Sequence, residues 1–174
     1  MISNASPLIY FGKLNKLDLL VRLFDKIEIT QSVYEEIIYG EDNNSEVEII
    51  KEFISKKLII IERLESKISG ISNFIKKSFK LHNGESDTIA LAMQNNTKKV
   101  IIDEKSARKA AELHGMFPIG TLGVVLLAYK KDIVSEIDVG DIIEKLISDN
   151  FRIGAEVLNE FWKSFDLVKK DKKK

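Results

Sequence analysis

The chain contains no cysteine among its 174 residues, so it can form neither a disulfide nor a thiolate metal site. The absence of disulfides fits a reducing compartment, and we expect a cytoplasmic protein. Two histidines are too few for a metal site built on imidazole. The longest apolar run, residues 122–129, falls far short of the roughly 20 residues that span a bilayer. Because the N-terminus also lacks the pattern of a signal peptide, we expect no contact with a membrane.

The chain also has no net charge, because 27 basic residues balance 27 acidic ones. This balance argues against a protein that coats nucleic acid by charge alone, since such affinity comes from many phosphate contacts. It leaves room for an enzyme that holds a short stretch of RNA at one site. Only four basic residues are arginine, so few side chains could make bidentate hydrogen bonds to phosphate. A hydrophobic fraction of 44% and a charged fraction of 31% are typical of a globular protein.

Short apolar runs alternate with helical patterns of about ten residues along the chain. Serine followed by proline at residues 6 and 7 predicts the start of the first helix, and Asn83 with Gly84 predicts a turn. The alternation predicts βαβ units, and therefore an α/β fold with a parallel sheet covered on both faces. We expect one domain over residues 1–165 and a lysine-rich, disordered tail over residues 166–174. The predicted strands cover residues 26–29, 58–61, 99–102 and 116–119.

Acidic residues stand at the ends of several predicted elements. Asp103 directly follows the strand at 99–102, and ligands of open parallel sheets bind beyond the carboxyl ends of the strands. A cap for the next helix would explain Asp103 equally well. Glu85 and Asp87 open a helix, where the helix dipole also stabilises acids. Because they are two residues apart, they cannot share one helix face, and the sequence does not separate their roles.

Glu36 has acidic neighbours, so a solvated acidic face is one interpretation, whereas the apolar Ile37 beside it suggests a place near the buried edge. Carboxylates that converge need a cation to offset their repulsion, and a hard divalent cation is the usual one. Asn4 follows a start too short to be a confident strand and could be a turn residue that caps the next helix. Lys105 and Arg108 follow Asp103 within two helical turns and could hold a phosphate, or they are exposed charges of an amphipathic helix.

Five segments, in order along nearly the whole chain, together resemble the PIN-domain nuclease family. They are residues 3–9 (SNASPLI), 30–37 (TQSVYEEI), 84–92 (GESDTIALA), 102–108 (IDEKSAR) and 120–124 (GTLGV). The first and last are similar to an uncharacterised prokaryotic PIN-like subfamily. The resemblance implies a three-layer α/β/α sandwich with a central, mainly parallel sheet. It also implies a ribonuclease that depends on Mg²⁺ or Mn²⁺, often as a homodimer and as the toxin that an antitoxin protein neutralises.

The resemblance assigns roles to matching positions of this chain. The implied catalytic acids are Glu36, Glu85, Asp87 and Asp103. The implied metal ligands are Glu36, Asp103, Asn4 and Glu104. The predicted substrate contacts are Ser6, Lys105 and Arg108. Single-stranded RNA is the expected substrate, because its bases and 2′-hydroxyls are accessible.

Asn4 departs from the family pattern, which usually has aspartate at this position. An amide oxygen can ligate a cation but carries no charge, and one close unit-charge interaction is worth on the order of 4 kcal/mol at a moderate dielectric. We therefore expect weaker metal binding, or a module that has lost activity and docks a protein or RNA. A phosphoacceptor domain with Asp103 as acceptor is a third alternative. It requires an acidic pair near the first strand, which the chain does not provide there.

Overall fold

The protein is described by a computed structural model that covers residues 1–40, 45–149, 151 and 153–172. The chain divides into two compact units, Met1–Gly120 and Thr121–Lys174. The elements of the first unit are β1 (Ile2–Ser3), α1 (Ala5–Lys13), α2 (Leu17–Phe24), β2 (Ile27–Thr30), α3 (Gln31–Tyr39), α4 (Ser45–Ser55), β3 (Ile59–Glu62), α5 (Ser66–Phe79), α6 (Asn83–Gln94), β4 (Lys99–Ile101), α7 (Lys105–Leu113) and β5 (Phe117–Ile119). Those of the second unit are α8 (Thr121–Lys130), α9 (Glu136–Ser148) and α10 (Ala155–Asp171).

The first unit is built on a parallel sheet. Within the described residues it has five strands in the order β3-β2-β1-β4-β5, and every neighbouring pair is parallel. β1 has only two residues, yet it lies at the centre of the sheet, where Ile2 pairs with Glu28 of β2 and with Val100 of β4. Because all the strands run the same way, their carboxyl ends share one edge.

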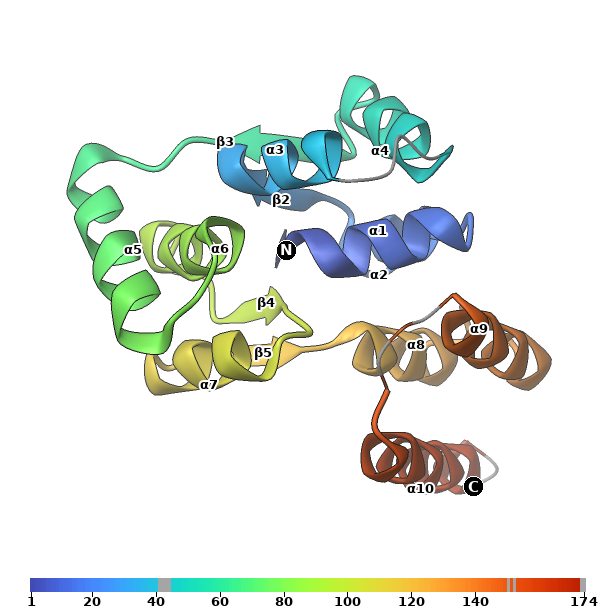
Figure 1. Ribbon diagram of the computed structural model, residues 1–174. Coiled ribbons are helices and arrows are strands. Elements are labelled where there is room, and N and C mark those ends of the chain that lie inside the picture. The colour runs from blue at the N-terminus through green and yellow to red at the C-terminus, as the bar shows by residue number, and fades with distance from the viewer. Residues whose placement is uncertain (41–44, 150, 152, 173–174) are drawn as a thin grey trace. The chain divides into compact units, whose positions relative to one another are not determined.

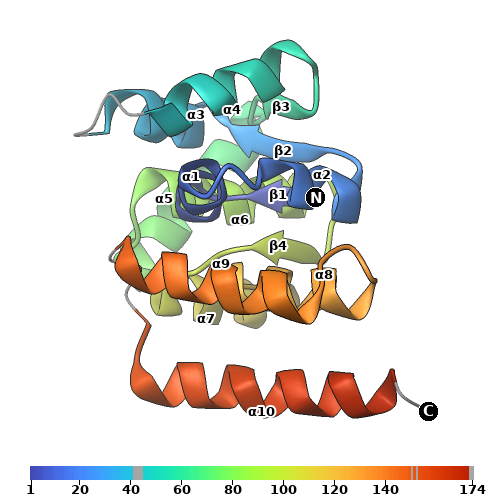
Figure 2. The same cartoon turned by 90° about the vertical axis from the view of Figure 1, so that its right-hand side faces the viewer.

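Helices cover both faces of this sheet (Figure 1). Helices α6 and α7 lie on one side, with α5 packed against α6, and helices α1 and α4 lie on the other. In Figure 2, α1 is in front of β1 and α6 is behind it. This arrangement confirms the predicted α/β fold with helices on both sides of a parallel sheet, consistent with a three-layer sandwich.

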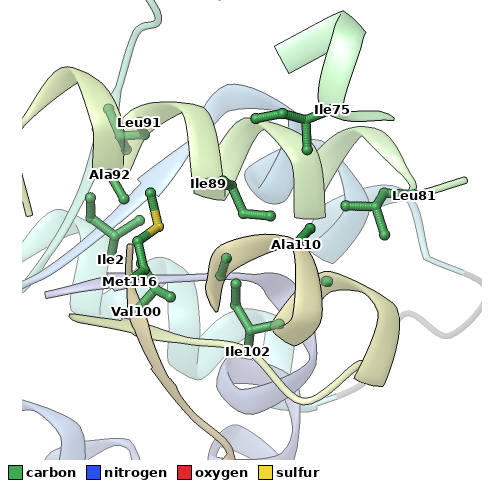
Figure 3. Packing of buried hydrophobic residues seen from close by; sticks show 12 residues of the cluster. Ile2, Ile75, Leu81, Ile89, Leu91, Ala92, Val100, Ile102, Ala110 and Met116 are labelled. Atoms are coloured by element: carbon green, nitrogen blue, oxygen red, sulfur yellow. The ribbon is translucent and has the colours of Figure 1, made fainter. Parts of the chain in front are cut away.

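The core beneath α6 and α7 fixes these helices against the sheet (Figure 3). Ile2 and Val100 project from the central strands toward Ile89 of α6, and all three are fully buried. Each such side chain stabilises the fold by about 1.5–3 kcal/mol relative to exposure. Ala110 is also fully buried, and its small side chain lets α7 pack closely. The start of α6 is thereby held at the carboxyl edge of the sheet.

Two helices begin earlier than the sequence predicts. Helix α1 begins at Ala5, so Ser6 is a helical residue and the N-cap position falls to Asn4. The predicted cap at Ser6 is therefore wrong. Asn83 and Gly84 are the first residues of α6 and not a separate turn, because the Glu85 carboxylate accepts a hydrogen bond from the backbone N–H of His82 and closes the first turn.

The second unit consists of helices α8, α9 and α10. The rings of Tyr129 and Phe165 lie 4.5 Å apart and join α8 to α10. Ser135 caps α9 by accepting a hydrogen bond from the backbone N–H of Asp138. Helix α10 continues to Asp171 and so extends into the segment 166–174 that was expected to be a disordered tail. Among the described residues, no helix is long and apolar enough to cross a membrane.

Candidate functional site

Asn4 follows β1 directly and lies at the carboxyl edge of the sheet. Its backbone N–H donates to the carbonyl of Ile101 at 3.1 Å, which holds it beside the end of β4. The side chain is 4% exposed, and Oδ1 is buried without a hydrogen-bond partner in the described structure. Although Asn4 occupies the N-cap position of α1, its side chain makes no capping hydrogen bond. Since an unsatisfied buried oxygen is unfavourable, this atom points to a ligand that supplies the missing partner.

Asp103 lies two residues beyond the end of the neighbouring strand, β4. A Cβ atom placed on Gly120 would be 2.8 Å from Oδ1 of Asp103 and 3.0 Å from Nη1 of Arg108. The carboxylate and the guanidinium group therefore both pack against the backbone of Gly120. Arg108 also donates to the carbonyl of Ile102 at 3.4 Å. The Arg108 side chain is thus folded back over the end of β4, next to Asp103.

Glu36 lies on α3, the helix that follows β2. The side chain as a whole is exposed, but its carboxyl end is pressed against α6, where a Cβ atom on Gly84 would overlap with Oε2. Glycine at this position therefore makes room for the carboxylate. Local burial raises the pKa of Glu36, the charge of Glu85 raises it further, and His82 lowers it. Glu36 and Glu85 are thus close enough to repel each other.

Replacing Glu36 with glutamine should stabilise the protein at pH 7. Burial raises the folded-state pKa of Glu36 above its ordinary value of 4.5, so the folded chain binds more protons than the unfolded chain between these two values. The contribution of Glu36 to stability is therefore present below pH 4.5 and is lost as the pH rises through the raised pKa. Urea unfolding between pH 4 and 8 should show Glu36→Gln gaining over the wild type as the pH increases. Glu35→Gln makes the same chemical change at the adjacent, exposed position of α3 and is the control.

The structure distinguishes Glu85 from Asp87, which the sequence could not do. Glu85 is 9% exposed, and its charge is close enough to Glu36 to raise the pKa of that carboxyl. The Asp87 carboxylate instead accepts hydrogen bonds from the hydroxyls of Ser32 on α3 and Ser72 on α5, both at 2.5 Å. Asp87 therefore connects three helices, and its oxygens are engaged in that connection.

Replacing Asp87 with alanine should destabilise the fold by about 3 kcal/mol, because each hydrogen bond to a charged group contributes roughly 1.5–3 kcal/mol. Asp87→Asn should lose less, since an amide can still bond both hydroxyls. Urea unfolding curves of the two variants would measure the difference. If Asp87→Ala kept its stability but no longer bound Mn²⁺, Asp87 would be a metal ligand and not a connecting residue.

The remaining predicted site residues lie around this edge. Glu104 is exposed at the N-cap position of α7, and it accepts a hydrogen bond from Ser106 at 3.3 Å. Lys105 begins α7 and is exposed, and Ser6 lies in the first turn of α1.

The candidate acids form pairs and not one tight cluster. Glu36 lies near Glu85, whereas Asn4 and Asp103 follow the paired strands β1 and β4, where the Asn4 backbone N–H donates to the carbonyl of Ile101. Helix α6 leads into the start of β4, so the other end of α6, its N-terminus, lies at the edge where β4 ends. Glu36, which packs on Gly84 at the start of α6, and Asp103, which follows β4, therefore lie at this common edge. In the described part of the chain, no three His, Cys, Asp or Glu residues are grouped closely enough to hold a metal ion.

His82 was missed as part of this edge. It is exposed at the N-cap position of α6, and it lies close enough to Glu36 to lower the pKa of that carboxyl. Two histidines are too few for a metal site built on imidazole, so no role was predicted for His82. The available signal was the change of charge around His82, because Lys77 and Lys80 precede it and Glu85 follows it.

The fold and this edge define a class of protein: a parallel α/β domain with acidic and amide oxygens beyond the central strands. A comparison with protein families gives a match to the PIN domain over residues 1–166. A comparison with curated proteins gave no similar sequence. The chain belongs to the PIN domain family, whose members are generally metal-dependent nucleases, so it is a nuclease-type module.

Proposed function

We propose that this chain is a metal-dependent endoribonuclease that hydrolyses RNA phosphodiester bonds at the carboxyl edge of its sheet. The single observation that carries the proposal is the buried Oδ1 of Asn4, which has no hydrogen-bond partner in the described structure and belongs to a residue held at the carboxyl edge by its backbone hydrogen bond to Ile101. In a domain of nuclease type, an oxygen that accepts no hydrogen bond at the carboxyl edge of the sheet is a suitable ligand for a divalent cation.

The donor set fits a hard divalent cation, because every candidate ligand supplies oxygen. The residues that would hold Mg²⁺ or Mn²⁺ are Glu36 with Glu85 at the start of α6, or Asp103 with Asn4 at the ends of β4 and β1, and water would complete the coordination. Such an ion supplies positive charge that stabilises the negative charge developing on the phosphoryl oxygens.

The protein side chains would perform the remaining tasks. Burial and the charge of Glu85 both raise the pKa of Glu36, so a cation held there would relieve the repulsion between the two carboxylates. Arg108 lies beside Asp103 and would orient that carboxylate and attract the phosphate.

The test is an assay with a 5′-labelled, unpaired 20-nucleotide RNA, incubated with protein and Mn²⁺, Mg²⁺ or EDTA. We expect internal cleavage with Mn²⁺ or Mg²⁺ and none with EDTA. A preparation that leaves several RNA sequences intact with both metals would overturn the proposal.

We also propose that the enzyme acts on single-stranded RNA in the cytoplasm as a homodimer, and that it is the toxin of a toxin–antitoxin pair. The family resemblance supports these roles. Expression of the wild-type chain in bacteria should then arrest growth, and Asp103→Asn should relieve the arrest.

A second candidate function is a binding module that docks RNA or a protein without cleaving. Two observations favour it: the neutral Asn4 in place of the family's aspartate, and the absence of a three-acid cluster among the described residues. Restoring the charge at residue 4 discriminates between the two functions.

A further inference from the structure

The two carboxylates near the start of α6, those of Glu36 and Glu85, are held in different ways. Glu85 accepts a hydrogen bond from the backbone N–H of His82 at 2.9 Å, so the direction of its side chain is fixed within its own helix, α6. Glu36 belongs to another helix, α3. The distance between the two carboxylates therefore depends on how α3 is attached to α6, and so does the ability of one cation to contact both.

Helix α3 is attached to α6 along one stripe of residues. The Ser32 hydroxyl donates to Oδ2 of Asp87 at 2.5 Å, and Glu36, one turn further along α3, lies against Gly84, one turn back along α6. The fully buried Val33 also packs on Gly84. Since Ser32 and Glu36 are four residues apart, they lie on the same face of α3. The hydrogen bond to Asp87 therefore holds the face of α3 that carries Glu36.

This hydrogen bond belongs to a chain of four side chains. Thr30, the last residue of β2, has its hydroxyl 3.0 Å from that of Ser32, and because Ser32 gives its one hydrogen to Asp87, the Thr30 hydroxyl is the donor in that pair. Oδ1 of Asp87 accepts from the Ser72 hydroxyl of α5 at 2.5 Å. The chain thereby joins the carboxyl end of β2 to three helices, and α6 packs against both α3 and α5 (Figure 1).

We propose that Ser32 is a positioning residue of the nuclease site: by holding α3 on Asp87, it keeps Glu36 at the distance from Glu85 at which one divalent cation contacts both. Asp87 serves this attachment and does not bind the cation. Residues that orient the ligands of a metal site contribute roughly 10–100-fold to metal affinity. The inference rests on the proposed nuclease function and deepens it, because it concerns the same site.

Ser72 supplies a matched control. Ser32→Ala and Ser72→Ala each remove one hydroxyl donor from the same carboxylate, that of Asp87. Ser32 holds the helix that carries Glu36, whereas Ser72 holds α5, which contains no acidic residue. Ser72 is buried and Ser32 is half-buried, so the control should lose at least as much stability. We expect each variant to lower the melting temperature in EDTA by about 5 °C.

Binding of Mn²⁺ should separate the two variants. The full chain is titrated with Mn²⁺ alone in a calorimeter, at a temperature where every variant is folded. We expect Ser32→Ala to raise the Kd for Mn²⁺ about tenfold. Ser72→Ala should stay within about twofold of the wild type, and so should Ser32→Thr, which keeps the hydroxyl. A purely structural role would weaken both alanine variants alike.

Amide hydrogen exchange in EDTA measures the attachment of the helices without metal or RNA. Ser32→Ala should increase the exchange of α3 more than that of α5, because it releases α3 from Asp87. Ser72→Ala should have the opposite pattern and affect α5 more than α3. This crossed result shows that each hydroxyl holds its own helix, and it does not depend on cleavage.

Each outcome decides the proposal. It is overturned if the wild type binds no Mn²⁺, if Ser32→Ala binds Mn²⁺ like the wild type, or if both alanine variants lose affinity equally. Tighter binding by both variants would show that the hydroxyls compete with the cation for Asp87, which would then be a ligand. The expected losses of affinity without any cleavage of RNA would support the role of Ser32 and reject the nuclease. Cleavage that Ser32→Ala leaves unchanged would reject the role of Ser32 alone.

Discussion

Replacing Asp103 with asparagine should lower the rate of RNA cleavage about a thousandfold. The substitution keeps the shape of the side chain and removes one negative charge from the edge where the metal would bind. A close unit-charge interaction is worth on the order of 4 kcal/mol at a moderate effective dielectric, and every 1.36 kcal/mol is a factor of ten in rate. Initial rates of cleavage with saturating Mn²⁺ would measure the loss.

The fold should survive this substitution. Asp103 packs against Gly120 and beside Arg108, and asparagine fits the same space. The free energy of unfolding should therefore fall with urea concentration with the same slope in both proteins. Glu112 supplies the control, because it is an exposed acid at the other end of α7. Glu112→Gln should cleave within about twofold of the wild type. Equal rates for wild type and Asp103→Asn would show that this edge does not perform the chemistry.

The fold was predictable because its signals are local and repeated. Apolar runs such as residues 99–102 alternate with helical patterns, and this alternation allows few arrangements other than a covered parallel sheet. The central strand was not predictable with confidence, since Ile2 and Ser3 alone form it. Its place depends on pairing with β2 and β4, which only the assembled sheet supplies.

The sequence predicts that the candidate site lies at the carboxyl edge of the sheet, but not how its residues are arranged there. Asp103 could be placed at the carboxyl edge because it follows a predicted strand, whereas the place of Asn4 at the same edge depends on the pairing of β1 with β4, which the sequence does not reveal. The separate roles of Glu85 and Asp87 were not predictable, because they depend on hydroxyls of Ser32 and Ser72 that are 55 and 15 residues away from Asp87. Long-range contacts of this kind leave no periodic pattern in the sequence.

Replacing Asn4 with aspartate should have opposite effects with and without a divalent cation. Asn4 is buried, and its Oδ1 has no donor within the described structure. Without metal, a carboxylate there is a buried charge with no partner, so we expect the free energy of unfolding at pH 7 to fall by about 3 kcal/mol. With metal, the same charge attracts the cation, and we expect the affinity for Mn²⁺ to rise about a hundredfold.

Binding and folding are linked, so one titration measures both effects. A ligand that binds only the folded chain stabilises it by about 2.7 kcal/mol at a concentration one hundred times its Kd. The melting temperature of Asn4→Asp should therefore start below that of the wild type and increase more steeply as Mn²⁺ is added. Asn73→Asp makes the same chemical change at an exposed position of α5 and should follow the wild type throughout.

The two candidate functions predict different dependences of the Asn4→Asp melting temperature on the Mn²⁺ concentration. If the edge is a metal site that is one charge short, Mn²⁺ restores the stability that the new carboxylate removes, and calorimetry detects tighter binding than in the wild type. If the acids are remnants in a binding module, the variant is destabilised and Mn²⁺ does not restore it. In that case the amide is retained because a neutral oxygen is easier to bury than a charge, and the oxygen of Asn4 would accept a hydrogen bond from a docked partner.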